Sequence, residues 1–168
     1  MSEAAEGDMD AFEELVCRYQ HGAFNVAKNM LSDEHLAADV AQEAFLRILK
    51  NAEKYKPKAR FSTYFYSILK RICIDHYRKR KPDFKPDFSA DAADMDTPQE
   101  MLLRQESAQN VHDAIAALPP RQQMALTLKH FHQMSYKEIA EIMGCSASAV
   151  DSLLMRAREG LKSSLDNP

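Results

Sequence analysis

The polar side chains best placed for chemistry lie in residues 135–158. Ser135 and Glu138 have the spacing of a capping box, in which each side chain accepts a hydrogen bond from the other residue's backbone N–H. Gly144 can end that helix in a left-handed conformation, and Ser146 can cap a second helix. The spacing therefore predicts a helix, a tight turn and a second helix. Since the second helix of such a unit commonly enters the DNA major groove, the expected chemistry is hydrogen bonding and cationic contact to DNA.

A second group of candidate side chains lies in a basic block that the net charge of −3 conceals. Residues 51–82 hold ten bases and two acids, whereas residues 1–50 hold four bases and ten acids and residues 83–118 hold two bases and eight acids. Tyr64 and Arg71 would share a helix face in this block. Aromatic rings stack on unpaired bases while cations bind phosphates, so the block suits single-stranded nucleic acid. The alternative is that its tyrosines are half-buried core residues with long basic neighbours.

The sequence gives little support for an enzyme or a metal site. Cys17 and His21 are four positions apart, and His130 and His132 flank Phe131, but neither pair has the further ligands that a zinc site needs. The chain has no Walker loop, no GxSxG motif and no dinucleotide fingerprint. We therefore expect no catalytic residue, no metal and no cofactor. The three cysteines form no CxxC pair, which suits reduced thiols, each buried as a small hydrophobe.

The elements that position these side chains are predicted to be helices. The chain has 168 residues, 45% of them apolar, only four glycines, and apolar positions that repeat with helical spacing. Helices are expected over about residues 9–30, as one helix or two joined near His21, and over about 34–52, 62–81 and 121–132. The residues expected to face the core of this first part are Phe12, Leu15, Val16, Tyr19, Phe24, Val26, Ala27, Met30, Leu36, Val40, Ala44, Ile48, Phe65, Ile68, Leu69 and Ile72.

Residues 82–99 concentrate Pro and Asp without helical periodicity, which predicts an acidic linker that keeps two domains apart or occupies a basic groove on a partner. A second helical unit is expected to start near Gln99, with an amphipathic run of Met101, Leu102, Val111, Ile115 and Leu118. The predicted fold is therefore all-α, with two small helical domains, 1–82 and 100–168, joined by a flexible acidic linker at 83–99. The first ten residues are acidic, unlike a secretory signal, and no window reaches the roughly 18 apolar residues of a membrane span, so we expect a cytoplasmic protein without membrane insertion.

One helix face in residues 34–52 combines carboxylates and an amide with an exposed leucine. Such a face could dock a partner helix, and the alternative is an ordinary solvated surface. The residues of this face are Asp39, Gln42, Glu43, Leu46 and Lys50.

The order of these features, over nearly the whole chain, resembles the extracytoplasmic-function sigma factors, which are initiation subunits of bacterial RNA polymerase. Each motif alone is common, but the ordered set is specific. The motifs are residues 10–16 (DAFEELV), 39–49 (DVAQEAFLRIL), 61–69 (FSTYFYSIL), 74–80 (IDHYRKR), 118–122 (LPPRQ) and the helix-turn-helix ending at 155–161 (MRAREGL).

The resemblance implies a sigma-2-like domain at 1–82, for polymerase docking and for recognition and opening of the −10 promoter element, and a sigma-4-like domain at 100–168 for the −35 element. The implied partners are core RNA polymerase (its β′ coiled coil and β flap), promoter DNA in duplex and single-stranded form, and a cognate anti-sigma factor. Polymerase docking falls to Asp39, Gln42, Glu43 and Leu46. Contact with the −10 element falls to Lys58, Arg60, Phe61, Tyr64, Tyr66, Lys70, Arg71 and Arg78. Contact with the −35 element falls to Ser146, Ser148, Ala149, Asp151, Ser152, Met155, Arg156 and Arg158.

Some positions depart from the family pattern. Tyr64 stands where a tryptophan is common, and Asp151 and Leu153 stand where basic residues are common in the recognition helix. Arg156, Arg158 and Lys162 would then carry most of the cationic contact, so the isolated domain is expected to bind DNA weakly. Two other interpretations stay open from the residues alone: a stand-alone dimeric helix-turn-helix factor, and an all-helical adaptor that binds only proteins.

Overall fold

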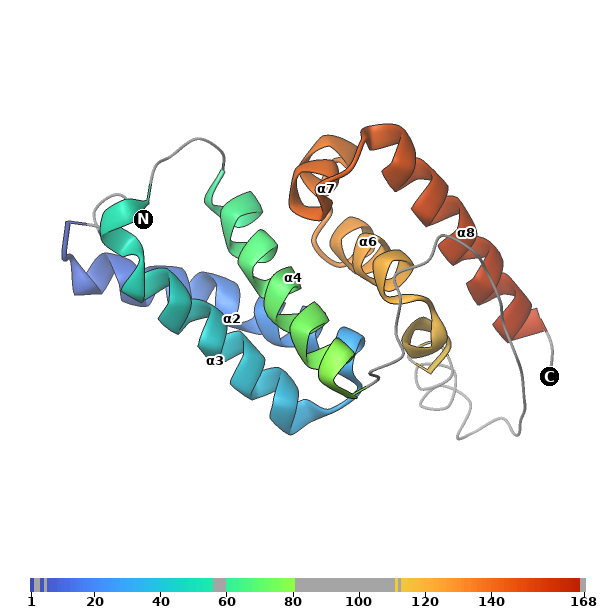
Figure 1. Cartoon of the computed structure of the whole chain (residues 1–168), viewed down its shortest axis with the longest axis horizontal. Helices are drawn as coiled ribbons and strands as arrows, with labels where there is room; N and C mark the ends of the chain where they lie inside the picture. The colour runs from blue at the N-terminus through green and yellow to red at the C-terminus, as the bar shows by residue number, and fades with distance from the viewer. Residues whose placement is uncertain (2–3, 5, 56–59, 81–110, 112, 167–168) are drawn as a thin grey trace.

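The computed structural model describes residues 1, 4, 6–55, 60–80, 111 and 113–166, and every regular element among them is helical, which confirms the all-α prediction (Figure 1). The N-terminal unit consists of α2 (Met9–Leu31), α3 (Glu34–Lys50), the short 3₁₀ turn η1 (Ala52–Lys54) and α4 (Phe61–Arg80). The C-terminal unit consists of α6 (Pro120–His130), α7 (Tyr136–Met143) and α8 (Ala147–Asp166). The predicted linker, Met101 and Leu102 lie outside the described residues.

Helix α2 is one continuous helix, and local hydrogen bonds define its ends. The Asp8 carboxylate accepts from the backbone N–H of Ala11 at 3.0 Å and so caps the first turn. Ser32 adopts a left-handed conformation (φ 51°) that ends α2. Asp33 then accepts from the N–H of Leu36 at 3.0 Å and starts α3. This tight connection places α2 and α3 side by side in opposite directions (Figure 1).

The core of the N-terminal unit is built on alanines between α2 and α3. Ala23 and Ala27 on α2, and Ala37 and Ala44 on α3, are fully buried. Small side chains let the helices approach closely, and larger residues from α4 close the core. Burial is confirmed for the predicted core residues Val26, Ala27, Met30, Val40, Ala44, Ile48, Phe65, Leu69 and Ile72. The other predicted core residues are only partly buried: Phe12, Leu15, Val16, Tyr19, Phe24, Leu36 and Ile68.

Aromatic rings join α4 to the other two helices. Tyr19 on α2 lies edge-on to Phe61, with ring centres 5.1 Å apart. Phe45 on α3 lies 4.9 Å from Phe65, and Tyr66 lies edge-on to Phe65 at 5.2 Å. Each such pair adds about 0.5–1.5 kcal/mol beyond the burial of its surface. This cluster fixes the first turns of α4, and with them the direction in which its polar residues point.

The C-terminal unit has the predicted helix-turn-helix. Ser135 and Glu138 form a capping box at the start of α7, and Gly144 ends the helix in the left-handed region at φ 66°. The Ser146 hydroxyl accepts from the N–H of Ala149 at 3.1 Å and caps α8. The predicted apolar stripe of α7 is buried, which confirms its orientation: Ile139, Ala140, Ile142 and Met143.

The two units pack against each other. Helix α7 lies along α4, and α6 lies against α2 (Figure 1). Buried apolar residues of both units form one continuous cluster. Gln123 on α6 is only 1% exposed, and its side-chain amide donates to the carbonyl of Asn29 near the end of α2. A hydrogen bond of this kind fixes the position of α6, because a buried amide without a partner is destabilising.

The cysteine prediction is correct for one residue of three. Cys73 is buried, and its burial raises the pKa of the thiol to about 12. Cys17 is exposed, and Cys145 is half-buried and packs against the core. None of the helices described here is long and apolar enough to cross a membrane. The described residues also bring together no group of three or more His, Cys, Asp or Glu side chains that could hold a metal ion.

Candidate nucleic-acid and partner interfaces

The outer face of α3 carries the residues predicted to dock on a partner: Asp39, Gln42, Glu43 and Leu46. Leu46 is 49% exposed, although it is a large apolar residue. Glu43 is half-buried and accepts from Arg47 at 2.6 Å, while its other oxygen lies 3.7 Å from Nε2 of His76 on α4. The face therefore offers an apolar side chain surrounded by hydrogen-bonding groups, a composition that suits a protein partner.

A groove of about 430 Å³ lies between α2 and α3 beside this face. Its lining is mostly apolar and consists of Phe12, Val16, Gln20, Phe24, Ala38, Ala41, Gln42, Phe45 and Leu46. Phe12, Val16 and Phe24 are predicted to face the core, but each is only partly buried and lines this groove. The sequence feature that could have predicted the groove is the small size of Ala38 and Ala41 on α3. Two alanines opposite three large residues leave space that no side chain fills.

The predicted −10 residues on and before α4 differ in exposure. Arg71 and Arg78 are exposed, and the side chain of Arg60 is 80% exposed. Lys58 lies outside the described residues. Arg60 directly before α4, with Arg71 and Arg78 on the helix, forms a cationic surface of the kind that binds a phosphate backbone.

The aromatic residues at the start of α4 are held by neighbouring rings. Phe61 and Tyr64 are both half-buried, with ring centres 6.4 Å apart. Tyr55, at the end of η1, lies 5.1 Å from Tyr64, and its burial there raises the pKa of Tyr55. The half-buried Tyr64 keeps part of its surface in solvent for stacking. Tyr55, which sequence reasoning does not select, fixes the orientation of that ring.

Tyr66 contradicts the expectation that it lines an accessible DNA surface, since it is only 4% exposed. The physical reason lies 66 positions further along the chain, where His132 covers it. The Tyr66 hydroxyl is 3.0 Å from Nδ1 of His132, and the two ring centres are 4.8 Å apart. Burial raises the pKa of Tyr66 and lowers the pKa of His132. Both groups are therefore held in their neutral forms.

Lys70 also contacts the C-terminal unit. Its ammonium group donates to the carbonyl of Ile142 at 2.6 Å. Ile142 lies in the last turn of α7, where carbonyls lack intrahelical partners and carry the negative end of the helix dipole. Burial, followed by repulsion from Arg71 and Arg121, lowers the pKa of Lys70.

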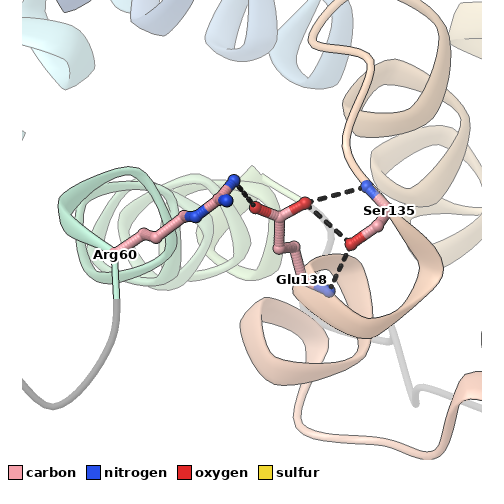
Figure 2. Close-up of polar contacts among 3 residues, drawn as sticks. All are labelled: Arg60, Ser135 and Glu138. Atoms are coloured by element: carbon pink, nitrogen blue, oxygen red, sulfur yellow. Dashed lines mark hydrogen bonds and ion pairs between the residues drawn. The ribbon is translucent and has the colours of Figure 1, made fainter.

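Arg60 and the capping box meet at one carboxylate, which Figure 2 shows. One Glu138 oxygen accepts from the Ser135 N–H at 2.9 Å and from the Ser135 hydroxyl at 2.7 Å. The other oxygen accepts from the Arg60 guanidinium at 2.9 Å. The bonds from Ser135, with a smaller effect of Arg60, lower the pKa of Glu138. Glu138 therefore shapes the helix-turn-helix and also contacts the N-terminal unit.

The residues predicted to read duplex DNA lie on α8 and the turn before it: Ser146, Ser148, Ala149, Asp151, Ser152, Met155, Arg156 and Arg158. All of them are exposed except the half-buried Ala149. Helical spacing places Ser148, Asp151, Ser152 and Met155 on one face. The Ser152 hydroxyl donates to the carbonyl of Ser148 at 3.0 Å, and Met155 is 53% exposed. This face combines hydrogen-bonding groups with an apolar side chain that can contact a thymine methyl.

Leu153 belongs to the opposite face of α8. It is 8% exposed, and Val150, Leu154 and Ala157 beside it are fully buried. The interpretation of Leu153 as a departure at a DNA-facing position is therefore wrong, because this residue packs in the core.

The structure thus presents an exposed basic surface with half-buried aromatic rings on α4, an exposed polar surface on α8 and an acidic surface with an exposed leucine on α3. The family model described as Sigma-70 region 2 matches residues 15–82, and the model described as Sigma-70, region 4 matches residues 108–161.

Three relatives extend the match over nearly the whole chain. The chain is 30% identical to the ECF RNA polymerase sigma factor SigW of Bacillus subtilis, over 98% of this chain and 94% of that protein. It is 34% identical to the RNA polymerase sigma-H factor of Pseudomonas aeruginosa, over 95% and 88% of the two chains. It is 30% identical to the ECF RNA polymerase sigma-E factor of Escherichia coli, over 93% and 87%.

The chain therefore belongs to the sigma-70 family, in its extracytoplasmic-function group. It is an alternative sigma factor, which binds core RNA polymerase and promoter DNA and directs transcription initiation. This membership sets aside the stand-alone dimeric helix-turn-helix factor and the adaptor that binds only proteins.

Two solved structures have a similar fold. CnrH, solved in complex with the cytosolic domain of CnrY, aligns with a TM-score of 0.76 at 25% identity, over 98% of this chain and 94% of CnrH. The sigma factor RpoE of Bartonella quintana, solved with the anti-sigma factor NepR, aligns with a TM-score of 0.72 at 21% identity, over 93% and 97% of the two chains.

Proposed function

We propose that the two units divide promoter recognition between them. Residues 1–82 would open the −10 element with α4, residues 100–168 would read the −35 element with α8, and residues 83–99 would link the two. The support for this division is the chemistry of each face. Helix α4 offers guanidinium groups and rings, which suit a single strand, whereas the exposed face of α8 offers short polar side chains, which suit base edges in a duplex.

The acidic and apolar face of α3 would dock on the coiled coil of the polymerase β′ subunit. An exposed leucine between carboxylate and amide groups supports this assignment, because partner helices commonly insert apolar residues into such a surface. The family pattern adds a contact between the C-terminal unit and the β flap. Polymerase would perform the chemistry, so the chain would not be an enzyme and would need no metal or cofactor. It would act in the cytoplasm, where core polymerase lies.

An anti-sigma factor would control the protein. The complex of CnrH with the cytosolic domain of CnrY supports this proposal, since CnrH matches nearly the whole chain. The groove between α2 and α3 shares Gln42 and Leu46 with the polymerase-docking face. An inhibitor helix bound in this groove would therefore compete directly with polymerase.

The main observation that supports these separate roles of α4 and α8 is that Arg71 on α4 and Arg156 on α8 are both exposed. Photo-crosslinking tests it, with a benzoylphenylalanine introduced at one of these positions in the holoenzyme on a promoter selected from a random library. Position 71 should crosslink to the −10 non-template strand, and position 156 to the −35 duplex. Position 50 on α3, which is also exposed, is the control and should crosslink to neither. Crosslinking of both test positions to the same element would contradict the proposal.

A further inference from the structure

We propose that α7 and the turn before it form an intramolecular latch that covers the −10 surface of α4 when no partner is bound. Three contacts make up the latch: Arg60 with Glu138, Tyr66 with His132, and Lys70 with the carbonyl of Ile142. This inference rests on the proposed role of α4 in promoter opening.

The Glu138 carboxylate engages one terminal nitrogen of Arg60 that a DNA phosphate would otherwise bind. It accepts from the guanidinium at 2.9 Å, with the Arg60 side chain 80% exposed and the Glu138 side chain 22% exposed. A carboxylate bound to this terminal nitrogen competes with a phosphate oxygen for the same donor. A DNA strand must therefore displace Glu138 before it can bind Arg60 fully.

The other two contacts act in the same direction. The Lys70 ammonium group donates to the carbonyl of Ile142 in the last turn of α7, and this oxygen serves as a second substitute for a phosphate oxygen. Tyr66 is covered by His132, so its ring cannot stack on a base while the units are closed. In contrast, Arg71 and Arg78 stay exposed. The closed chain therefore keeps the cationic attraction of Arg71 and Arg78 for DNA, while the C-terminal unit engages Arg60, Tyr66 and Lys70.

Gly22 shows how closely the units approach at this junction. Although it lies in the interior of α2, where glycine is unfavourable, a Cβ atom there would lie 2.6 Å from the Tyr66 hydroxyl and 2.9 Å from Cε1 of His132. A side chain at this position would push the tyrosine and the histidine apart. Gly22 thus permits the closed arrangement of α2, α4 and the α6–α7 turn.

Glu138→Gln is the variant that separates the latch from the capping box. Glutamine can keep the capping-box bonds of Glu138, but it loses the charge that attracts Arg60. Two controls match it. Ser135→Ala weakens the cap and leaves the ion pair, while Glu141→Gln, at an exposed position of α7, removes the same charge from the same helix.

The closed state is measured by pulsed electron paramagnetic resonance on the free full-length protein, with spin labels at Lys50→Cys and Lys162→Cys and with Cys17 and Cys145 changed to Ser. Wild type, Ser135→Ala and Glu141→Gln should give one narrow distance. Glu138→Gln should add a population at longer distance. Gly22→Ala should do the same, although alanine strengthens α2 itself. A narrow, unchanged distance in both Glu138→Gln and Gly22→Ala would overturn the latch.

Binding to a single-stranded oligonucleotide with the −10 non-template sequence gives the second measurement. Free Glu138→Gln protein should bind about two- to fivefold more tightly than wild type, as expected from release of one exposed ion pair. An equal gain in Glu141→Gln would mean that only net charge matters and would overturn the latch. Run-off transcription with core polymerase tests the proposed function separately, because the label distances need neither DNA nor polymerase.

Discussion

In the C-terminal unit the recognition face of α8 is open to solvent, whereas in the N-terminal unit part of the corresponding face of α4 is covered by α7 and the turn before it. Ser148 and Asp151 are exposed, but Tyr66 is buried and Lys70 binds a carbonyl of the other unit. Under the proposed division of roles, the engaged groups of α4 (Arg60, Tyr66 and Lys70) would bind an opened strand, and the exposed face of α8 would read a closed duplex. Arg71 and Arg78 on α4 stay exposed, so the proposed latch would restrain strand binding only at these three groups.

The largest expected effect comes from removing the ring that anchors α4. Phe65 is fully buried and contacts Phe45, Tyr19 and Tyr66. Phe65→Ala should lower the free energy of unfolding by about 3–5 kcal/mol, measured by chemical denaturation with circular dichroism.

Phe131→Ala is the control for this change in the other unit, because Phe131 is 57% exposed. It should change the free energy of unfolding by less than about 0.5 kcal/mol. Similar effects of the two variants would contradict the packing described for α4.

The next largest effect is expected at the polymerase-docking face of α3. Leu46→Asp should weaken binding to core polymerase by about 2 kcal/mol, because it places a charge where an apolar contact is expected. Titration of labelled protein with core polymerase measures it. Leu165→Asp, on α8, is the matched control because Leu165 is 48% exposed against 49% for Leu46. Equal losses of affinity for core polymerase in the two variants would contradict the assignment of α3 as the docking helix.

Two arginines compare the DNA faces directly. Arg71→Ala should lower promoter opening, and Arg156→Ala should lower initial promoter binding, each by about 1–2 kcal/mol. Permanganate footprinting reports opening, and gel shift of the holoenzyme on duplex DNA reports binding. Arg18→Ala, which removes an exposed arginine of α2, should change neither. A loss of both activities in each variant would mean that the two faces do not act separately.

The smallest expected effect is that of pH on the closed state. Burial lowers the pKa of His132 from its ordinary value of 6.5, so the closed state favours the neutral ring. Its contribution is complete above pH 6.5 and is lost as the pH falls toward the lowered pKa. The charged and titratable groups of this pocket are Arg18, Tyr19, Arg60, Tyr66 and Glu138. The raised pKa of Tyr66 and the lowered pKa of Glu138 keep both of these groups from titrating in this window.

Acidification below pH 6.5 should therefore increase the long-distance population of the spin-labelled protein. His132→Phe keeps an aromatic ring against Tyr66 but has no titrating group, so its distance distribution should not change over the same range. A wild-type distribution that is constant with pH would show that His132 does not report on closure.

The parts of the fold that sequence reasoning predicts are those fixed by neighbours in the chain. Ser135, Glu138, Gly144 and Ser146 act within one helical turn, so their roles follow from spacing alone. The core face of α7 follows from helical periodicity in the same way. The burial of Leu153 could also be predicted from helical spacing, since Val150, Leu154 and Ala157 mark the buried face of α8.

The contacts that sequence reasoning misses join residues far apart in the chain. The burial of Tyr66 depends on His132, and the partner of Arg60 is Glu138. No local pattern predicts these pairs, because their members lie 78 and 66 positions apart in the sequence. The −10 surface was therefore predicted by residue type, while its partial cover by α7 emerges only from the packing of the two units.

Run-off transcription by core RNA polymerase from a random promoter library tests the central claim most directly. With the protein present, initiation should begin at promoters that share a two-part motif, and Arg71→Ala and Arg156→Ala should lose selection of different parts. No initiation above that of core polymerase alone, or selection of a single motif unaffected by both substitutions, would contradict the account.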